Sequence, residues 1–130
     1  MIKPCIINIA GTYTIDVARK LVISKVAGVE MAIDLLAQHN HLRSDPLFRP
    51  DFGKIKDFSA TTGVQVTGDD IRRLIVGSPF RSGSRRSLVV PRPALIGIGR
   101  MYQILSEDHG VDLRLFDNLA EASRWLGIEA

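Results

Sequence analysis

Residues 87–105, SLVVPRPALIGIGRMYQIL, decide the fold class of this 130-residue chain. The stretch opens with a continuous apolar run, which suits a strand that is covered on both faces. Pro93 then stands where a first helical turn tolerates proline. After it, apolar residues recur at helical spacing at Leu95, Ile98, Met101, Tyr102 and Leu105. A buried strand followed by an amphipathic helix predicts an α/β sheet.

The same alternation of strand and helix continues on both sides of this stretch. Residues 54–58 and 111–116 are predicted strands. Thr67 opens a helix, with Asp70 three residues later as its partner in a capping box, and Asn118 opens the last helix. Strands that alternate with helices in this way predict a largely parallel sheet with right-handed connections.

The N-terminal part has a different pattern. Residues 5–9, 12–17 and 21–26 are predicted strands, and the last two form an antiparallel hairpin. A helix follows Gly28 and fades near His41. Its predicted buried face consists of apolar residues at helical spacing, namely Val29, Ala32, Ile33 and Leu36. The full order predicts a mixed α/β sheet with an N-terminal antiparallel hairpin and about four helices.

The composition is that of an ordinary globular protein. Hydrophobic residues make up 45% and charged residues 24% of the chain, and its length predicts one domain over residues 1–130. Cys5 is the single cysteine, which excludes an internal disulfide and a cysteine-rich zinc site. The sequence has no apolar run of about 20 residues and no secretory signal, so we expect a cytoplasmic protein without a transmembrane segment.

The net charge of +3 is unevenly distributed. Residues 71–106 contain seven arginines and no acidic residue, whereas residues 107–130 contain two basic and six acidic residues. Either the acidic tail neutralises the basic block, or the block meets an anionic partner. Arg81, Arg85 and Arg86, in a predicted solvated loop, form the candidate anion patch. Because aromatic residues are only 6% of the chain, sequence-specific binding of nucleic acid is not expected.

Several short segments follow one another between about residues 12 and 127. They are Gly28, Asp45-Pro46 with Phe48-Arg49, Lys56-Asp57-Phe58-Ser59, Val89-Val90-Pro91, Gly97 with Gly99-Arg100-Met101-Tyr102, Leu115-Phe116 with Glu121-Ala122, and Trp125-Leu126-Gly127. In these segments and their order the chain resembles the SpoIIAA-like family of small bacterial proteins. That family has a STAS-like fold and is also grouped with lipid-binding CRAL-TRIO-type domains. The resemblance implies a STAS-like regulatory module that binds an apolar ligand or a protein partner.

Four residues in these segments are candidate ligand-binding residues, namely Asp57, Ser59, Arg100 and Tyr102. Asp57 stands at the carboxyl end of a predicted strand, where open α/β sheets bind their ligands. The alternative role of its carboxylate is to accept hydrogen bonds from the loop that follows.

The resemblance also implies a second function. Anti-sigma-factor antagonists of this fold carry an Asp-Ser-Ser-Gly-type segment at the start of the second helix, where a partner kinase phosphorylates the Ser or Thr before the glycine. Thr67 stands before Gly68 at that place, which makes it the candidate phosphoacceptor. Gln65 and Val66 replace the Asp and Ser of the motif, and Asp69 disfavours a phosphate beside it. The alternative is that Thr67 is only a helix cap.

Other constellations do not point to an enzyme or a cofactor. Gly97 and Gly99 lie within a predicted helix, and Tyr102 stands where a dinucleotide motif needs its third glycine. His39 and His41 are two residues apart and cannot share one helix face, so no metal is expected. Without a Ser-His-Asp set, we expect no catalytic residue and a non-enzymatic binding module. A protein partner, a small apolar ligand and a homodimer are all compatible with this sequence.

Overall fold

The computed structural model describes residues 2–6 and 11–128, and side chains from residue 13 onward. Within these residues, six strands form one mixed sheet in the order β1-β2-β3-β5-β7-β8. The strands are β1 (Ile2–Ile6), β2 (Gly11–Asp16), β3 (Leu21–Val26), β5 (Gly53–Asp57), β7 (Arg86–Val89) and β8 (Leu113–Phe116). The first three strands pair antiparallel, and β3, β5, β7 and β8 pair parallel. The predicted mixed sheet with its N-terminal hairpin is confirmed.

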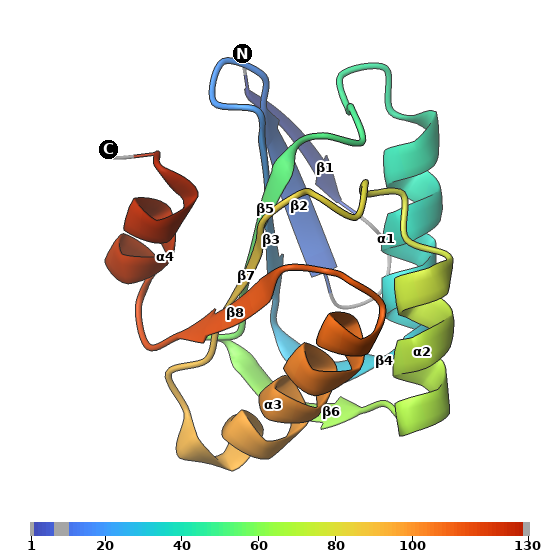
Figure 1. Cartoon of the computed structure of the whole chain (residues 1–130), viewed down its shortest axis with the longest axis vertical. Helices are drawn as coiled ribbons and strands as arrows, with labels where there is room; N and C mark the ends of the chain where they lie inside the picture. Colours follow the sequence, from blue (N-terminus) through green and yellow to red (C-terminus); the bar gives the residue numbers. More distant parts are fainter. Residues whose placement is uncertain (1, 7–10, 129–130) are drawn as a thin grey trace.

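Helices cover both faces of this sheet (Figure 1). They are α1 (Ala32–Ser44), α2 (Gly68–Val76), α3 (Pro93–Asp108) and α4 (Leu119–Leu126). Helix α4 lies on one face, where Ala122 packs with Leu21, Ile55 and Val89. The other three helices lie on the opposite face. None of the described helices has the length and hydropathy that a bilayer span requires.

A second, two-stranded sheet is formed by β4 (Gly28–Met31) and β6 (Thr61–Gln65), which pair parallel. These strands follow β3 and β5 after a sharp corner. Gly28 takes a φ of +80° at this corner, where a residue with a side chain would be strained. Its N–H donates to the carbonyl of Ala60, and the Thr61 hydroxyl donates to the carbonyl of Val26. The corner turns Glu30 of β4 toward the interior, where its side chain is buried. The sequence pattern did not predict this second sheet.

Several predictions from local sequence signals are confirmed. The run in β7 is buried throughout, as a strand covered on both faces requires. Pro93 lies in the first turn of α3, and Leu95 of that helix packs against Leu88 and Val90. Helix α2 begins with the predicted reciprocal capping box between Thr67 and Asp70. Of the predicted strand 5–9, positions 7–9 and the side chain of Cys5 lie outside the described residues.

The predicted buried face of α1 is wrong. Val29, Ile33 and Leu36 are 43%, 61% and 50% exposed, because Val29 belongs to β4 and the helix begins three residues later. The buried face of the helix consists of Asp34, Leu35, Gln38, His39 and Leu42. The polar members of this face lie over the part of the sheet that carries buried basic side chains. The buried face of α1 therefore combines the apolar residues Leu35 and Leu42 with polar residues, a mixture that hydrophobic periodicity does not reveal.

Close packing explains one of the two glycines in α3. A Cβ atom on Gly99 would lie 2.9 Å from Cδ2 of Leu115 in β8, so any side chain there would push the helix off the sheet. Gly97 has open space around it, and nothing in the structure explains it.

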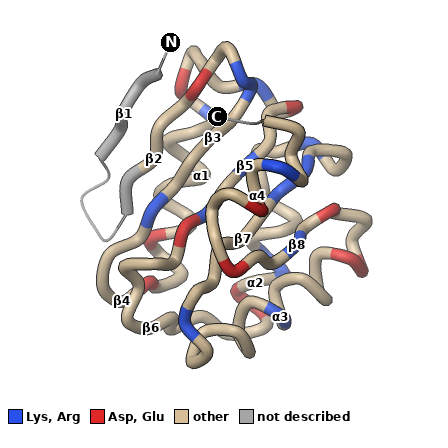
Figure 2. Tube along the Cα trace, turned by 90° about the vertical axis from the view of Figure 1, so that its left-hand side faces the viewer, with Lys and Arg blue, Asp and Glu red and all other residues tan. Residues whose placement is uncertain are grey.

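Acidic and basic positions are interspersed around the fold (Figure 2). Among the described residues, however, no ion pair within 4.0 Å joins an arginine of segment 71–106 to an acidic residue of segment 107–128. The predicted neutralisation of the basic block by the tail therefore does not take the form of direct ion pairs in this part of the chain.

Candidate functional site

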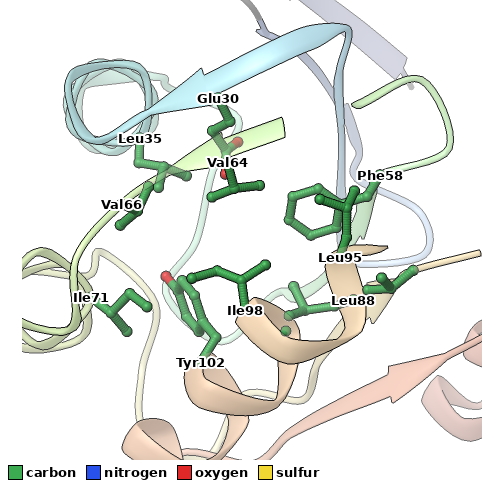
Figure 3. A pocket seen from close by; sticks show the side chains of 12 residues that line it. Glu30, Leu35, Phe58, Val64, Val66, Ile71, Leu88, Leu95, Ile98 and Tyr102 are labelled. Atoms are coloured by element: carbon green, nitrogen blue, oxygen red, sulfur yellow. The ribbon is translucent and has the colours of Figure 1, made fainter. Parts of the chain in front are cut away.

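A small apolar cavity lies between α3, α2 and the β4–β6 pair. We call it the α3 cavity; its volume is about 20 Å³, enough for one water molecule. The apolar lining residues are Leu35, Phe58, Val64, Val66, Ile71, Leu88, Val90, Leu95, Ile98 and Gly99. The other two are Glu30 from β4 and Tyr102 from α3, which point into the cavity from opposite sides (Figure 3). The lining of the cavity is almost wholly apolar.

Glu30, the acidic group of the α3 cavity, is engaged in a buried ion pair. Its carboxylate lies 2.7 Å from Nζ of Lys56, and both side chains are almost inaccessible to solvent. The same ammonium lies 5.3 Å from the ring centroid of Phe58. Burial, and then the negative charge of Glu30, raise the pKa of Tyr102 above its usual range. The Tyr102 hydroxyl therefore stays protonated and can act as a hydrogen-bond donor.

A second cavity of similar volume, about 20 Å³, adjoins the first and is basic. We call it the cationic cavity. Its lining residues are His39, Lys54, Lys56, Leu74, Ile75, Ser78, Phe80, Arg86, Ser87, Leu88, Tyr102 and Leu113. Lys54 and Arg86 are register partners on the adjacent parallel strands β5 and β7. The two cavities share Leu88 and Tyr102. An apolar cavity and a basic cavity therefore lie side by side on the face of the sheet that α1, α2 and α3 cover.

Burial changes the protonation of the groups in the cationic cavity. It lowers the pKa of Lys54 to about 7, and the nearby charge of Lys56 lowers it further while Glu30 opposes the shift. It also lowers the pKa of His39 to about 2, with additional repulsion from Lys54 and Lys56. Desolvation lowers the pKa of Arg86. Near neutral pH, His39 is uncharged and Lys54 is divided between its charged and neutral forms.

The structure brings only one of the four predicted ligand-binding residues to these cavities, namely Tyr102. Asp57 is half-buried, and its Oδ1 accepts a hydrogen bond from the Ser59 N–H at 2.8 Å, which is the loop-supporting role considered as the alternative. Ser59 is exposed. Arg100 is also exposed and lines a separate hollow of about 180 Å³ beside Asp117 and the ends of β7 and β8.

Thr67 is exposed at the N-terminus of α2. Its Oγ1 accepts a hydrogen bond from the Asp70 N–H at 3.1 Å, and the Asp70 carboxylate accepts one from the Thr67 N–H at 2.9 Å. The hydrogen bond from the Thr67 backbone lowers the pKa of Asp70. The helix cap is therefore formed, and its hydroxyl is accessible.

The three arginines of the predicted anion patch separate into two groups. Arg81 and Arg85 are exposed, and Arg85 lies over the ring of Trp125. The expectation that Arg86 belongs to a solvated loop is wrong. Arg86 is the first residue of β7 and is buried on the face of the sheet that α1, α2 and α3 cover. No group of three His, Cys, Asp or Glu side chains in the described part of the chain is placed to hold a metal ion.

Glu30, His39, Lys54 and Lys56, which are buried polar residues of the site, were not predicted as site residues, and Arg86 was predicted as an anion-patch residue but not as a buried one. One local signal was present. Lys54-Ile55-Lys56 alternates basic and apolar residues in a strand with helical segments on either side in the sequence. A period of two in a strand that is covered on both faces places both lysines on one buried face. The register that joins them to Arg86 had no such signal.

The sequence matches no protein-family model and no curated protein. In fold, the chain is similar to a solved structure from Shewanella loihica PV-4, described as an uncharacterized protein from the DUF3478 family with a SpoIIAA-like fold. The superposition has a TM-score of 0.56 at 15% sequence identity and covers 97% of this chain and 92% of that chain. This likeness agrees with the resemblance found in the sequence segments and with the observed sheet order. The chain has a SpoIIAA-like fold.

Proposed function

We propose that this protein is a non-enzymatic binding module that takes up a small apolar molecule in the α3 cavity. The observation that carries the proposal is the lining of that cavity, in which ten apolar residues from the sheet, three helices and β6 surround one carboxylate and one hydroxyl. Ligand sites are typically apolar with a few converging polar groups. Glu30 is held by Lys56, and Tyr102 stays protonated, so both groups suit recognition better than bond breaking.

Binding requires the cavity to widen, because its volume of about 20 Å³ has room for about one water molecule. An apolar surface lies next to the elements that close it. Val29, Met31, Ile33 and Leu36 are exposed on β4 and the start of α1, and they flank the lining residues Glu30 and Leu35. Displacement of this segment would expose the α3 cavity directly to an apolar ligand. We call these four exposed residues the β4–α1 patch.

Isothermal titration calorimetry with 1-octanol tests the proposal. The wild type should bind the alcohol. Ile98→Phe should weaken binding at least about tenfold, because the phenyl ring occupies space that the alkyl chain of 1-octanol needs. Ile104→Phe is the matched control on an exposed position of the same helix and should bind like the wild type. Absence of binding to the wild type, or equal binding by both variants, would contradict the proposal.

A second candidate is the phospho-switched anti-sigma-factor antagonist, with Thr67 as the acceptor. The observation in its favour is that the Thr67 side chain is exposed at a helix N-terminus, where a phosphate is electrostatically favoured. The carboxylates of Asp69 and Asp70 beside it oppose this. Mass spectrometry of the protein isolated from its own cells should detect a phosphate on Thr67 that is absent from Thr67→Ala. A fully unmodified Thr67 under all growth conditions would exclude this function.

The β4–α1 patch also fits a protein partner, including a second copy of the chain. Exposed contiguous apolar residues mark such contacts in many proteins. Sedimentation equilibrium of the wild type and of Ile33→Lys would measure self-association. A dimer that Ile33→Lys disrupts supports this use of the patch, and a monomer at all concentrations excludes the second copy as the partner.

A further inference from the structure

Two basic side chains lie next to each other on the buried face of the central strands. Lys54 and Arg86 are 8% and 7% exposed, and they are register partners on β5 and β7. The ring of Phe80 lies against both, with its centroid 5.5 Å from Nζ of Lys54 and 5.3 Å from Cζ of Arg86. Their charged groups therefore converge on one side of the cationic cavity.

Within the described residues, neither of these two cations has the acidic partner that usually compensates a buried charge. Among the described residues, neither forms an ion pair within 4.0 Å. Nζ of Lys54 lies 3.5 Å from Oε1 of Gln38, the limit of a hydrogen bond. Arg86 donates from Nη2 to the carbonyl of Arg81, whereas its buried Nε has no partner. Burying a charge costs free energy unless the charge is paired and hydrogen-bonded. A ligand with acceptor oxygens would therefore stabilise these two side chains.

Lys56, two residues after Lys54 on β5, is a buried cation that does have an acidic partner. Its ammonium is paired with the Glu30 carboxylate at 2.7 Å. Lys54, Lys56 and Arg86 line the same cavity, and the Glu30 carboxylate pairs with Lys56, so two positive charges remain when Lys54 is protonated. A guanidinium and an ammonium side by side match the geometry of a carboxylate or a phosphate group.

We propose that Lys54 and Arg86 form a buried binding site for an anionic group, a carboxylate or a phosphate. Because the cationic cavity and the α3 cavity share Leu88 and Tyr102, this group is the head of an amphipathic ligand whose apolar chain lies in the α3 cavity. The second statement rests on the proposed function, whereas the anion site itself does not.

The cationic cavity borders a hollow of the molecular surface. A surface hollow of about 230 Å³ shares Ile75, Ser78, Phe80 and Arg86 with the cationic cavity. Arg86 therefore stands between the interior and the solvent near the end of α2. The experiment must distinguish an amphipathic acid from a small inorganic anion.

Calorimetric titrations with octanoate, 1-octanol and inorganic phosphate make this distinction. The wild type should bind octanoate more tightly than 1-octanol. Lys54→Met and Arg86→Met should each weaken octanoate binding at least about tenfold, the value of a lost charge-assisted hydrogen bond, and leave 1-octanol binding unchanged. Lys25→Met is the control, because it removes an exposed lysine from neighbouring β3. It should bind all three compounds like the wild type.

The outcomes separate the two proposals. Equal affinity for octanoate and 1-octanol, unaffected by either variant, overturns the anion site and leaves the apolar binding module intact. Binding of phosphate alone, lost in both variants, supports the anion site and overturns the proposed function. Absence of binding of both octanoate and phosphate overturns the anion site. Arg86→Lys keeps the positive charge but loses the paired N–H donors of the guanidinium, so it should recover part of the octanoate affinity even where Arg86→Met folds poorly. Near-ultraviolet circular dichroism checks the folding of every variant.

Discussion

The two faces of strand β5 differ in chemistry. On one face, Ile55 packs with Leu21, Val89 and Ala122 beneath α4 in a wholly apolar cluster. On the other, Lys54 and Lys56 are buried beneath α1, α2 and α3, where the structure also places the two cavities. One strand thus carries a face that stabilises the fold and a face that buries positive charge.

The difference between these faces is informative because buried cations do not stabilise a fold efficiently. Well-packed apolar residues of similar volume often do as well or better than a buried ion pair. Helix α1 turns Asp34, Gln38 and His39 toward the basic face of the sheet, while its apolar residues Ile33 and Leu36 are exposed. The α4 face is wholly apolar, whereas the opposite face combines apolar clusters with buried charges, and there we place the function.

Breaking the ion pair on the basic face should have the largest effect. Glu30→Gln removes the one carboxylate that pairs with Lys56 and leaves a buried charge alone, so the free energy of unfolding should fall by about 3–5 kcal/mol. Urea denaturation measures the loss. The double variant Glu30→Met with Lys56→Met should recover most of it, and a double variant as unstable as the single one would contradict the assignment.

Truncation on the apolar face should have the next largest effect. Ile55→Ala leaves a cavity between β5 and α4, and the free energy of unfolding should fall by about 2–5 kcal/mol. Ile104→Ala, at an exposed position of α3, is the control and should change stability by less than about 0.5 kcal/mol. A similar loss in both variants would mean that the α4 face does not stabilise the fold in the way described.

The pH dependence of stability should distinguish Lys54 from the rest of the face. The pKa of Lys54 is about 7 in the folded protein and 10.5 in the unfolded chain, so the unfolded state binds more protons between these values. The unfolding free energy should therefore rise with pH from about 7 to about 10, by at most about 1.4 kcal/mol per pH unit.

The variant Lys54→Met should lose this rise and be as stable as the wild type or more stable at pH 7. The charged neighbours of Lys54 are Arg86 and the ion pair of Lys56 with Glu30. His39 and Tyr102 do not produce the rise, because His39 is neutral throughout this range and burial raises the pKa of Tyr102 above its usual range. A rise that persists in Lys54→Met would assign it to another group. The measurement is urea denaturation at a series of pH values.

The smallest effect should come from the surface, away from both faces of β5. Thr67→Ala removes the hydroxyl that accepts from the Asp70 N–H, so the free energy of unfolding should fall by about 1 kcal/mol. Thr67→Asp should be tolerated, because aspartate also caps helices. A loss in Thr67→Asp equal to that in Thr67→Ala would show that capping does not explain the residue.

The parts of the fold that were predicted correctly depend on neighbours in the sequence. The apolar run before Pro91, the helical spacing after Pro93 and the capping box at Thr67 are local signals, and each produced the expected element. Val29 shows where such signals fail. It fits the helical period of α1, yet the corner at Gly28 places it in β4, and the helix begins later and faces the other way.

The order of most strands and helices, the caps of α2 and α4 and the apolar character of β7 could be predicted from the amino-acid sequence, because these follow from backbone propensity and the spacing of neighbouring residues. Which side chains meet depends on how the strands and helices pack together. Lys54 and Arg86 come together because β5 and β7 pair in parallel with one particular register, and Glu30 reaches Lys56 because Gly28 turns β4 inward. The candidate site is built from such contacts, because pairing register and helix orientation depend on interactions between segments that are far apart in the sequence.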